Sequence, residues 1–251
     1  MDINFSGKIA LVTGASSGLG RATALGFAAA GASVFLVDIN QAGLDETKAA
    51  IDAAGGVSAI FCGDISAKAN CVAAVEAAVA AFGRLDILCN VAGIVKFARI
   101  PDVTEADWER MMRVNLHGPF YLCQAAIPHL LASHGNIVNV ASSAALKGQA
   151  YLCPYATSKA ALVHMTKSMA MEYVHKPIRI NAVAPGSMHT GMAETTTIPE
   201  GLDFSLIGRY SGLRAISTPE DVAETILFVA SDHAKSIHGA CVSVDGGITA
   251  D

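Results

Sequence analysis

The chain has 251 residues, of which 52% are hydrophobic and 16% are charged, and its formal net charge is −5. This apolar content excludes an intrinsically disordered chain. The negative balance, with no basic run, argues against nucleic acid or a membrane as a partner, because both require clustered positive charge. The length is that of one α/β domain, so we expect residues 1–251 to form a single domain.

Neither the N-terminus nor the cysteines and histidines point to export or to a metal centre. The first residues carry an acid where a secretory signal would carry bases, and the apolar stretches are too short to cross a bilayer or are interrupted. The histidines show no ligand spacing. We therefore expect a soluble, cytoplasmic protein without a metal ion. The cysteines lack CxxC spacing and are interpreted as reduced core residues: Cys62, Cys71, Cys89, Cys123, Cys153 and Cys241.

Short runs of β-branched residues alternate with longer Ala-rich segments of helical period as far as about residue 185. The predicted strands cover residues 9–13, 33–37, 57–61, 87–89, 136–140, 179–184 and 241–244. The predicted helices cover residues 19–30, 41–54, 69–82, 105–114, 119–131, 154–174 and 219–230. This alternation is typical of βαβ units. We predict a Rossmann-like, doubly wound α/β domain, with a seven-stranded parallel sheet and helices on both faces.

The regular pattern fails between Pro185 and Thr218, where Gly, Thr and Met residues mix without a strand pattern. A long irregular stretch inside a compact α/β domain is usually a functional loop. We predict a substrate-binding lid at about residues 187–217, and the alternative is a plain surface loop.

A glycine-rich turn, TGASSGLG at residues 13–20, follows the first predicted strand and opens a helix. Glycine lets the backbone approach a pyrophosphate, and the N–H groups of a helix N-terminus favour negative charge. A tight turn alone would also need glycine. A P-loop is excluded, because Arg21 and Ala22 follow Gly20 in place of Lys and Ser or Thr. The predicted cofactor-binding residues of this turn are Gly14, Ser16, Ser17, Gly18, Leu19 and Gly20.

Asp38 ends the second predicted strand, 18 residues after Gly20. An acidic side chain at this spacing can hydrogen-bond the adenosine ribose hydroxyls and repel a 2′-phosphate. This favours NAD over NADP, with Ile39 beside Asp38 as a further contact. The alternative is that Asp38 only caps the next helix. Arg21 is the one nearby base, and it is expected to face solvent or a phosphate.

Tyr155 and Lys159 lie one turn apart on one face of a predicted helix, in the segment YATSK. A tyrosine has an ordinary pKa of about 10. A neighbouring ammonium and the positive ring of an oxidised nicotinamide both stabilise phenolate, and we expect them to lower this pKa. Tyr155 is therefore a candidate acid/base group. Standing alone, Tyr-x-x-x-Lys is a weak pattern.

Several ordered motifs make the chain resemble the short-chain dehydrogenase/reductase (SDR) family, NAD type, over essentially its whole length. They are TGASSGLG at 13–20, GDIS at 63–66, NVAG at 90–93, RVNLHG at 113–118, NVASSAA at 139–145, YATSK at 155–159, NAVAPG at 181–186 and VDGG at 244–247. One departure is Val91, where many relatives carry a second Asn.

The resemblance implies four catalytic residues, Asn115, Ser142, Tyr155 and Lys159. Ser142 would hydrogen-bond the substrate oxygen, and Asn115 would hold a water in a proton relay with Lys159. Ser142 is preferred to Ser143 by its spacing to Tyr155. The implied substrate contacts are Ser142, Gln149, Tyr155 and His189.

Further cofactor contacts are implied along the same cleft. Asp64 would contact the adenine with Ile65 behind it. Independently of the family, Asn90 could instead close a strand and Thr190 could cap a lid helix. The implied cofactor contacts are Asp64, Ile65, Asn90, Ala92, Gly93, Tyr155, Lys159, Pro185, Gly186, Met188 and Thr190.

We therefore predict an oxidoreductase that transfers a hydride between NAD(H) and a secondary alcohol or ketone, with Tyr155 as general acid/base. The residues expected around the substrate are mostly apolar, which favours a small or medium hydrophobic ketone, a cyclic alcohol or a steroid-like molecule. The resemblance also implies a homotetramer formed through residues 119–131, 154–174 and 241–244.

Three alternatives stay open. The first is a 3-oxoacyl-carrier or CoA reductase of the same family, with Arg99, Arg209 and Arg214 as contacts to an acidic carrier. The second is a catalytically silent nucleotide-binding protein, since a fold does not guarantee an activity. The third is a sugar-nucleotide epimerase or dehydratase, which the glycine spacing and the chain length disfavour.

Overall fold

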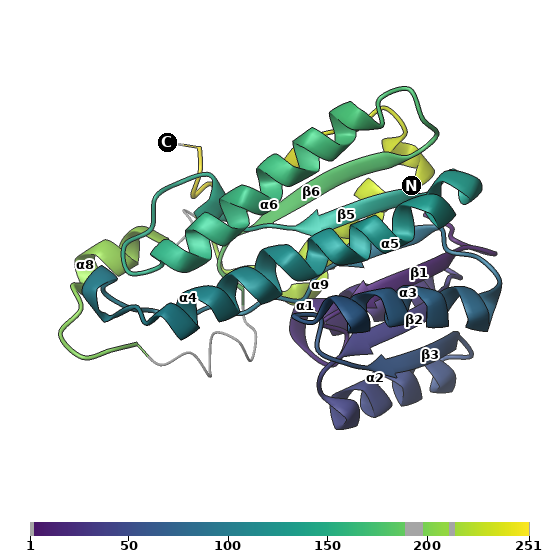
Figure 1. The fold of residues 1–251 in the computed structure, drawn as a ribbon, viewed down its shortest axis with the longest axis horizontal. Helices are drawn as coiled ribbons and strands as arrows, with labels where there is room; N and C mark the ends of the chain where they lie inside the picture. Colours follow the sequence, from purple (N-terminus) through teal and green to yellow (C-terminus); the bar gives the residue numbers. More distant parts are fainter. Residues whose placement is uncertain (1–2, 189–197, 211–213, 251) are drawn as a thin grey trace.

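The computed structural model describes residues 3–188, 198–210 and 214–250. Seven parallel strands form one sheet in the order β3-β2-β1-β4-β5-β6-β7 (Figure 1). The predicted seven-stranded parallel α/β fold is confirmed. The strands are β1 Ile9–Thr13, β2 Ser33–Asp38, β3 Val57–Cys62, β4 Ile87–Asn90, β5 Asn136–Val140, β6 Arg179–Pro185 and β7 Cys241–Val244.

The strand order reverses direction at the centre of the sheet. From β1 the chain winds outward through β2 to β3, and it then returns so that β4 pairs with the other side of β1. Between β1 and β4 the connections leave toward opposite edges, which opens a crevice beyond the carboxyl ends of these strands. Ligands of open parallel sheets bind at this point.

Helices cover both faces of the sheet (Figure 1). Successive residues of a strand point to opposite faces. Val12 accordingly belongs to the core under α1, α2 and α9, whereas Leu11 belongs to the core under α3 and α5. The main helices are α1 Gly18–Ala29, α2 Gln41–Ala53, α3 Lys68–Phe82, α4 Glu105–Met112, α5 Gly118–Ser133, α6 Cys153–Glu172 and α9 Pro219–Ala230.

Helices α4 and α5 are joined without a loop by a π-helical turn, Arg113–His117. The sequence predicted two separate helices, because Pro119 is typical of a helix start. A proline inside an α-helix clashes with the carbonyl four residues earlier, here that of Asn115. The wider π turn accommodates this clash and lets the helix continue. It also buries Asn115 completely.

The region of the predicted lid is described only in part, at residues 187–188, 198–210 and 214–217. It contains the short helix α8 Phe204–Ile207. The backbone N–H of Asp203 donates to the hydroxyl of Tyr151 at 3.2 Å, and Arg99 Nη2 donates to the carbonyl of Gly201 at 2.7 Å. This segment therefore packs against the loops that follow β4 and β5.

All six cysteines are free, but they are not all core residues. Cys71, Cys89 and Cys123 are buried, as predicted. Cys62 and Cys153 are exposed, because the first ends the edge strand β3 and the second begins α6, so the core interpretation is wrong for these two.

The described residues contain no group of His, Cys, Asp and Glu that could hold a metal ion. Among the same residues, no helix combines the length and hydropathy that a bilayer crossing requires.

Candidate active site

The turn between β1 and α1 can only be built from glycine at two of its positions. Gly14 has φ +72°, and a Cβ there would lie 3.0 Å from Ala92 Cα. A Cβ on Gly20 would lie 2.0 Å from the carbonyl oxygen of Gly14. The turn is thereby folded tightly against the N-terminus of α1, whose cap residue Ser17 makes no side-chain cap hydrogen bond. The backbone N–H groups here remain able to bind a phosphate.

Thr13 fastens this turn to the loop that follows β4. Its side chain is fully buried, and its hydroxyl accepts hydrogen bonds from the backbone N–H groups of Val91 and Ala92 at 3.0 and 3.1 Å. The two chain segments that flank the central crevice are therefore held together by one side chain.

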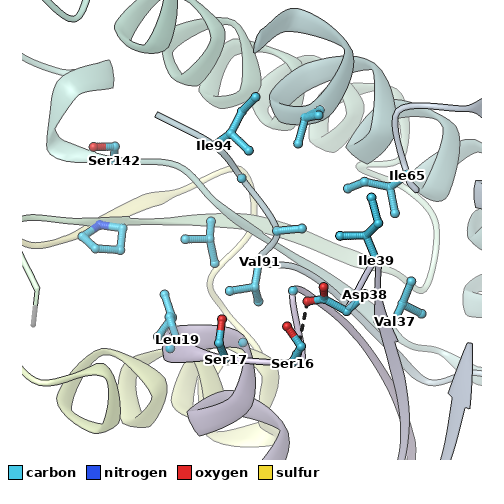
Figure 2. A pocket seen from close by; sticks show the side chains of 18 of the residues that line it. Ser16, Ser17, Leu19, Val37, Asp38, Ile39, Ile65, Val91, Ile94 and Ser142 are labelled. Carbon is cyan, nitrogen blue, oxygen red and sulfur yellow. Dashed lines mark hydrogen bonds between the residues drawn. The ribbon is translucent and has the colours of Figure 1, made fainter. Parts of the chain in front are cut away.

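A cavity of about 320 Å³ runs along the carboxyl ends of the strands from β3 to β6 (Figure 2). Its size and elongated lining suit a dinucleotide laid across the sheet edge. The predicted residues that line it are Gly14, Ser16, Ser17, Gly18, Leu19, Gly20, Asp38, Ile39, Asp64, Ile65, Ala92, Gly93, Ser142, Tyr155, Lys159, Pro185, Gly186 and Met188.

Asp38 lies at the end of β2 with its carboxylate turned toward the glycine-rich turn. Its Oδ2 accepts from Ser16 N at 3.1 Å (Figure 2), and its Oδ1 accepts from Asn40 N at 3.0 Å. The cap of α2 is Asn40, whose side chain accepts from Gly43 N. Asp38 is therefore not the helix cap, and it lines the cavity.

Arg21 is held by protein groups away from the cavity. Its guanidinium donates to the carbonyl of Ser16 at 2.6 Å, to Glu46 at 2.7 Å and to the hydroxyl of Thr47 at 3.0 Å. These bonds tie the glycine-rich turn to α2. Because its guanidinium is engaged in these bonds, Arg21 is not available to bind a phosphate beyond Asp38.

Lys159 is 3% exposed, and its Nζ donates to the carbonyl of Val140 at 2.8 Å. Burial lowers its pKa to about 8. Its Nζ lies 6.0 Å from the centroid of the Tyr155 ring. The two side chains therefore share one face of α6, as predicted.

Tyr155 differs from the prediction in the direction of its pKa. Burial raises the pKa of the phenol, and a hydrogen bond with Ser142 lowers it by less. The pKa of Tyr155 is not lowered as expected, because desolvation disfavours phenolate more strongly than the chain's own groups favour it. The second positive charge in the prediction, the oxidised nicotinamide ring, belongs to the cofactor and not to the chain.

Ser142 begins the turn after β5, where its hydroxyl accepts from Ala144 N at 3.1 Å. Its neighbour Ser143 is buried, and its hydroxyl accepts from Gln149 Nε2 at 3.4 Å. Ser142 lines the cavity and Ser143 does not. The hydroxyl of Ser142 and the phenol of Tyr155 can therefore act on one substrate oxygen.

Asn115 stands behind the cavity wall, in the π turn. Its Oδ1 accepts from Ile94 N at 2.8 Å, and its Nδ2 donates to Ile94 O at 2.9 Å. A Cβ on Gly93 would lie 3.3 Å from this Oδ1 and 3.2 Å from Lys159 Nζ. Asn115 and Lys159 thus both lie close to Gly93, where a side chain would crowd them.

Some predicted site residues lie elsewhere. Asn90 is 1% exposed, and its side-chain amide donates to Asn139 Oδ1 at 2.8 Å, so it points into the core behind the cavity and fits the strand-closing alternative. Gln149 contacts Ser143 and does not line the cavity. His189 and Thr190 lie outside the described residues.

Other residues line the cavity without having been predicted as contacts. Arg110 and Val114, four residues apart, project from the joined helix α4 and its π turn. Both fall within the predicted helix at residues 105–114, so their spacing on one helical face was a usable signal, but no motif marked them as contacts. The remaining ones lie at the ends of strands or directly after them: Val37, Gly63, Val91, Val140 and Ala141.

The fold and this cavity define a dinucleotide-binding α/β protein with a Ser-Tyr-Lys group at one end. Residues 14–249 match the protein family described as Enoyl-(Acyl carrier protein) reductase. The chain is 39% identical to an uncharacterized oxidoreductase of Thermotoga maritima, with 99% of this chain and 100% of that protein covered. It is 36% identical to the 3-oxoacyl-[acyl-carrier-protein] reductase FabG of the same organism, with 98% and 99% covered.

A solved structure of a short chain dehydrogenase from Mycobacterium paratuberculosis, bound to NAD, superposes with a TM-score of 0.92 at 28% identity. It covers 99% of this chain and 100% of the other. The chain belongs to the short-chain dehydrogenase/reductase family, whose enzymes are NAD(P)-dependent oxidoreductases acting on CH–OH groups.

Proposed function

We propose that the protein interconverts a secondary alcohol and a ketone with NAD(H), and that Tyr155 is the group that transfers the proton. The observation that carries the proposal is the arrangement of one continuous cavity. Asp38 lies at its β2 end, and Ser142, Tyr155 and Lys159 lie together at its β5 and α6 end. A dinucleotide in this cavity would have its adenosine at the first end and its nicotinamide at the second.

The preference for NAD is supported by the charges around Asp38. Its carboxylate can accept hydrogen bonds from two ribose hydroxyls and repels a 2′-phosphate. Arg21, the nearest base, is bound to Glu46 at 2.7 Å and does not line the cavity.

When bound, the cofactor supplies the acceptor or donor carbon for the hydride. The chain's own groups handle the proton and the oxygen. In the oxidation direction, the phenolate of Tyr155 takes the proton of the alcohol hydroxyl. The hydroxyl of Ser142 donates to the same oxygen and stabilises the charge that develops there. Lys159 holds the cofactor ribose, and its positive charge favours phenolate.

The substrate is proposed to be an apolar alcohol or ketone of small or medium size. Near Ser142 the cavity is bounded by Ile94, Val140, Pro185 and Met188. Burial of apolar surface against these side chains favours an apolar substrate.

A second candidate is a 3-oxoacyl-carrier reductase, favoured by the 36% identity to the Thermotoga maritima protein of that name. Of the arginines suggested as contacts to an acidic carrier, Arg99 already donates to the carbonyl of Gly201. We rank this candidate second.

The proposal is tested by absorbance at the reduced-nicotinamide band, with NAD and a panel of secondary alcohols. Tyr155→Phe is expected to lower kcat by at least a hundredfold and to leave the Kd for NADH within about threefold. Equal losses of kcat and NADH affinity in a folded variant would show that Tyr155 only helps to bind the cofactor.

We also propose a homotetramer. Large apolar side chains are exposed on the helices that the family uses for assembly, namely Phe120 on α5, which is 43% exposed, and Met171 on α6, which is 70% exposed. Packing these groups against another subunit would remove their apolar surface from water.

A further inference from the structure

The hydroxyl of Ser158 is fully buried on α6, between Tyr155 and Lys159, and takes no part in the proton steps described above. It donates to the backbone carbonyl of Tyr155 at 2.7 Å and accepts from Asn115 Nδ2 at 3.1 Å. It therefore links the first turns of the catalytic helix to the π turn that carries Asn115.

The direction of these bonds agrees with the orientation that Ile94 gives the Asn115 carboxamide, since Ile94 N donates to Asn115 Oδ1 and Asn115 Nδ2 donates to Ile94 O. A hydroxyl has one hydrogen, and Ser158 gives it to Tyr155 O, so only its lone pairs face Asn115. The amide nitrogen of Asn115, and not its oxygen, must therefore point toward Ser158. The Asn115 oxygen is left on the side of Gly93, where Lys159 Nζ also lies.

Another acceptor replaces Ser158 poorly. Asn115 Nδ2 also lies 3.1 Å from Met111 Sδ, but a thioether is a weak acceptor. The second N–H of this fully buried amide thus depends on Ser158 for a strong hydrogen bond. Loss of the hydroxyl would leave this N–H with the thioether alone and would break the side-chain link between the π turn and α6.

We propose that Ser158 is a positioning residue: it accepts from the Asn115 carboxamide and donates to the Tyr155 carbonyl, and so fixes the position of Asn115 relative to Tyr155 and Lys159 on the proton path. The inference rests on the proposed function, because it concerns the same proton transfer. Ser158 itself is buried behind the cavity and does not line it.

Ser158→Ala is expected to lower kcat about tenfold, to leave the KM for NAD within twofold and to increase the solvent isotope effect on kcat, because proton transfer becomes slower than the other steps. Thr157→Ala, at the exposed neighbouring position on the same helix, serves as the matched control and is expected to change none of these values. An unchanged isotope effect in Ser158→Ala would overturn the proposal.

A double-mutant cycle tests whether Ser158 acts through Asn115. In the Asn115→Ala background, adding Ser158→Ala is expected to cost less than a further twofold in kcat. A second tenfold loss would mean that Ser158 acts independently of Asn115, and the proposal would be wrong.

The wild type, the two single variants and the double variant of this cycle are also unfolded in urea, a measurement that needs no substrate. The double variant is expected to shift the unfolding midpoint by less than the sum of the two single-variant shifts, because both substitutions break the same hydrogen bond. Additive shifts would show that the two side chains are not coupled. A wild-type enzyme inactive on every alcohol would instead defeat the proposed function while leaving the coupling measurable.

Discussion

At the scale of single residues, the proposed preference for NAD depends on Asp38. Its carboxylate is held by the N–H groups of Ser16 and Asn40, so it cannot swing aside to admit a 2′-phosphate without breaking two hydrogen bonds. Each such bond to a charged group contributes roughly 1.5–3 kcal/mol.

Asp38→Ala is expected to raise the ratio of kcat/KM for NADP to that for NAD at least tenfold, because the repulsion of the 2′-phosphate disappears. Steady-state rates with both cofactors measure this. Asp45→Ala removes a carboxylate on α2 outside the cavity and should leave the ratio unchanged. A ratio that stays the same in Asp38→Ala would mean that another group excludes the 2′-phosphate.

Lys159 should make the free energy of unfolding depend on pH. Its pKa is about 8 in the folded chain, below the ordinary 10.5, because burial disfavours the charge. Between these values the unfolded chain binds more protons than the folded one, so stability rises with pH, by about 1.4 kcal/mol per pKa unit of separation at most.

Wild type should therefore gain stability between pH 8 and pH 10 relative to Lys159→Met, which has no such titration. Urea unfolding at several pH values gives the difference. Lys167→Met, at an exposed position on the same helix, should track the wild type. A difference between wild type and Lys159→Met that is constant with pH would contradict the lowered pKa.

The residue-scale predictions from sequence depended on how local each signal was. The shared helix face of Tyr155 and Lys159 was predicted from their spacing, whereas Ser142 was assigned from the resemblance to the family. The predicted direction of the Tyr155 pKa was wrong, since the sequence gives the neighbouring cation but not the depth of burial, which has the larger effect.

At the scale of elements, the turn between β1 and α1 tolerates no side chain at Gly20. Gly20→Ala would bring a Cβ within 2.0 Å of the Gly14 carbonyl oxygen, so backbone must move. We expect the affinity for NADH to fall more than tenfold and stability to fall by about 1–3 kcal/mol. Fluorescence titration and urea unfolding measure the two effects.

Gly148→Ala is the matched control, because a Cβ at Gly148 meets no atom within 4 Å. If Gly20→Ala bound NADH as tightly as Gly148→Ala does, the close approach at Gly20 would not matter for the cofactor.

Element boundaries show the limit of sequence reasoning in a different way. The strands were found within one residue of their observed ends, because short β-branched runs bounded by polar residues are distinctive. The break predicted before Pro119 was wrong, since the π turn allows a continuous helix there. A hydrophobic pattern with the 3.6-residue period of an α-helix does not reveal a turn that contains one extra residue.

At the scale of the whole molecule, exposed apolar groups on α5 and α6 predict assembly. Phe120→Glu should convert a tetramer into smaller species, because a charge buried at an interface without a partner is costly. Light scattering measures the mass. Val57→Glu, at a position on β3 that is 55% exposed, should leave the mass unchanged. A wild-type monomer would contradict the assembly directly.

The parallel direction of the strands was predictable, because each connection contains a helix long enough to carry the chain back to the end of the sheet where the previous strand began. The geometry of residues 187–217 was not, because no periodic pattern constrains that stretch.

The bonds from Thr13 to Val91 and Ala92 have a kinetic consequence. Since they brace both walls of the crevice before any nucleotide arrives, little conformational entropy is lost on docking. The association rate of the nucleotide should then be close to that of diffusional encounter, and Thr13 variants should differ from the wild type mainly by a faster dissociation rate.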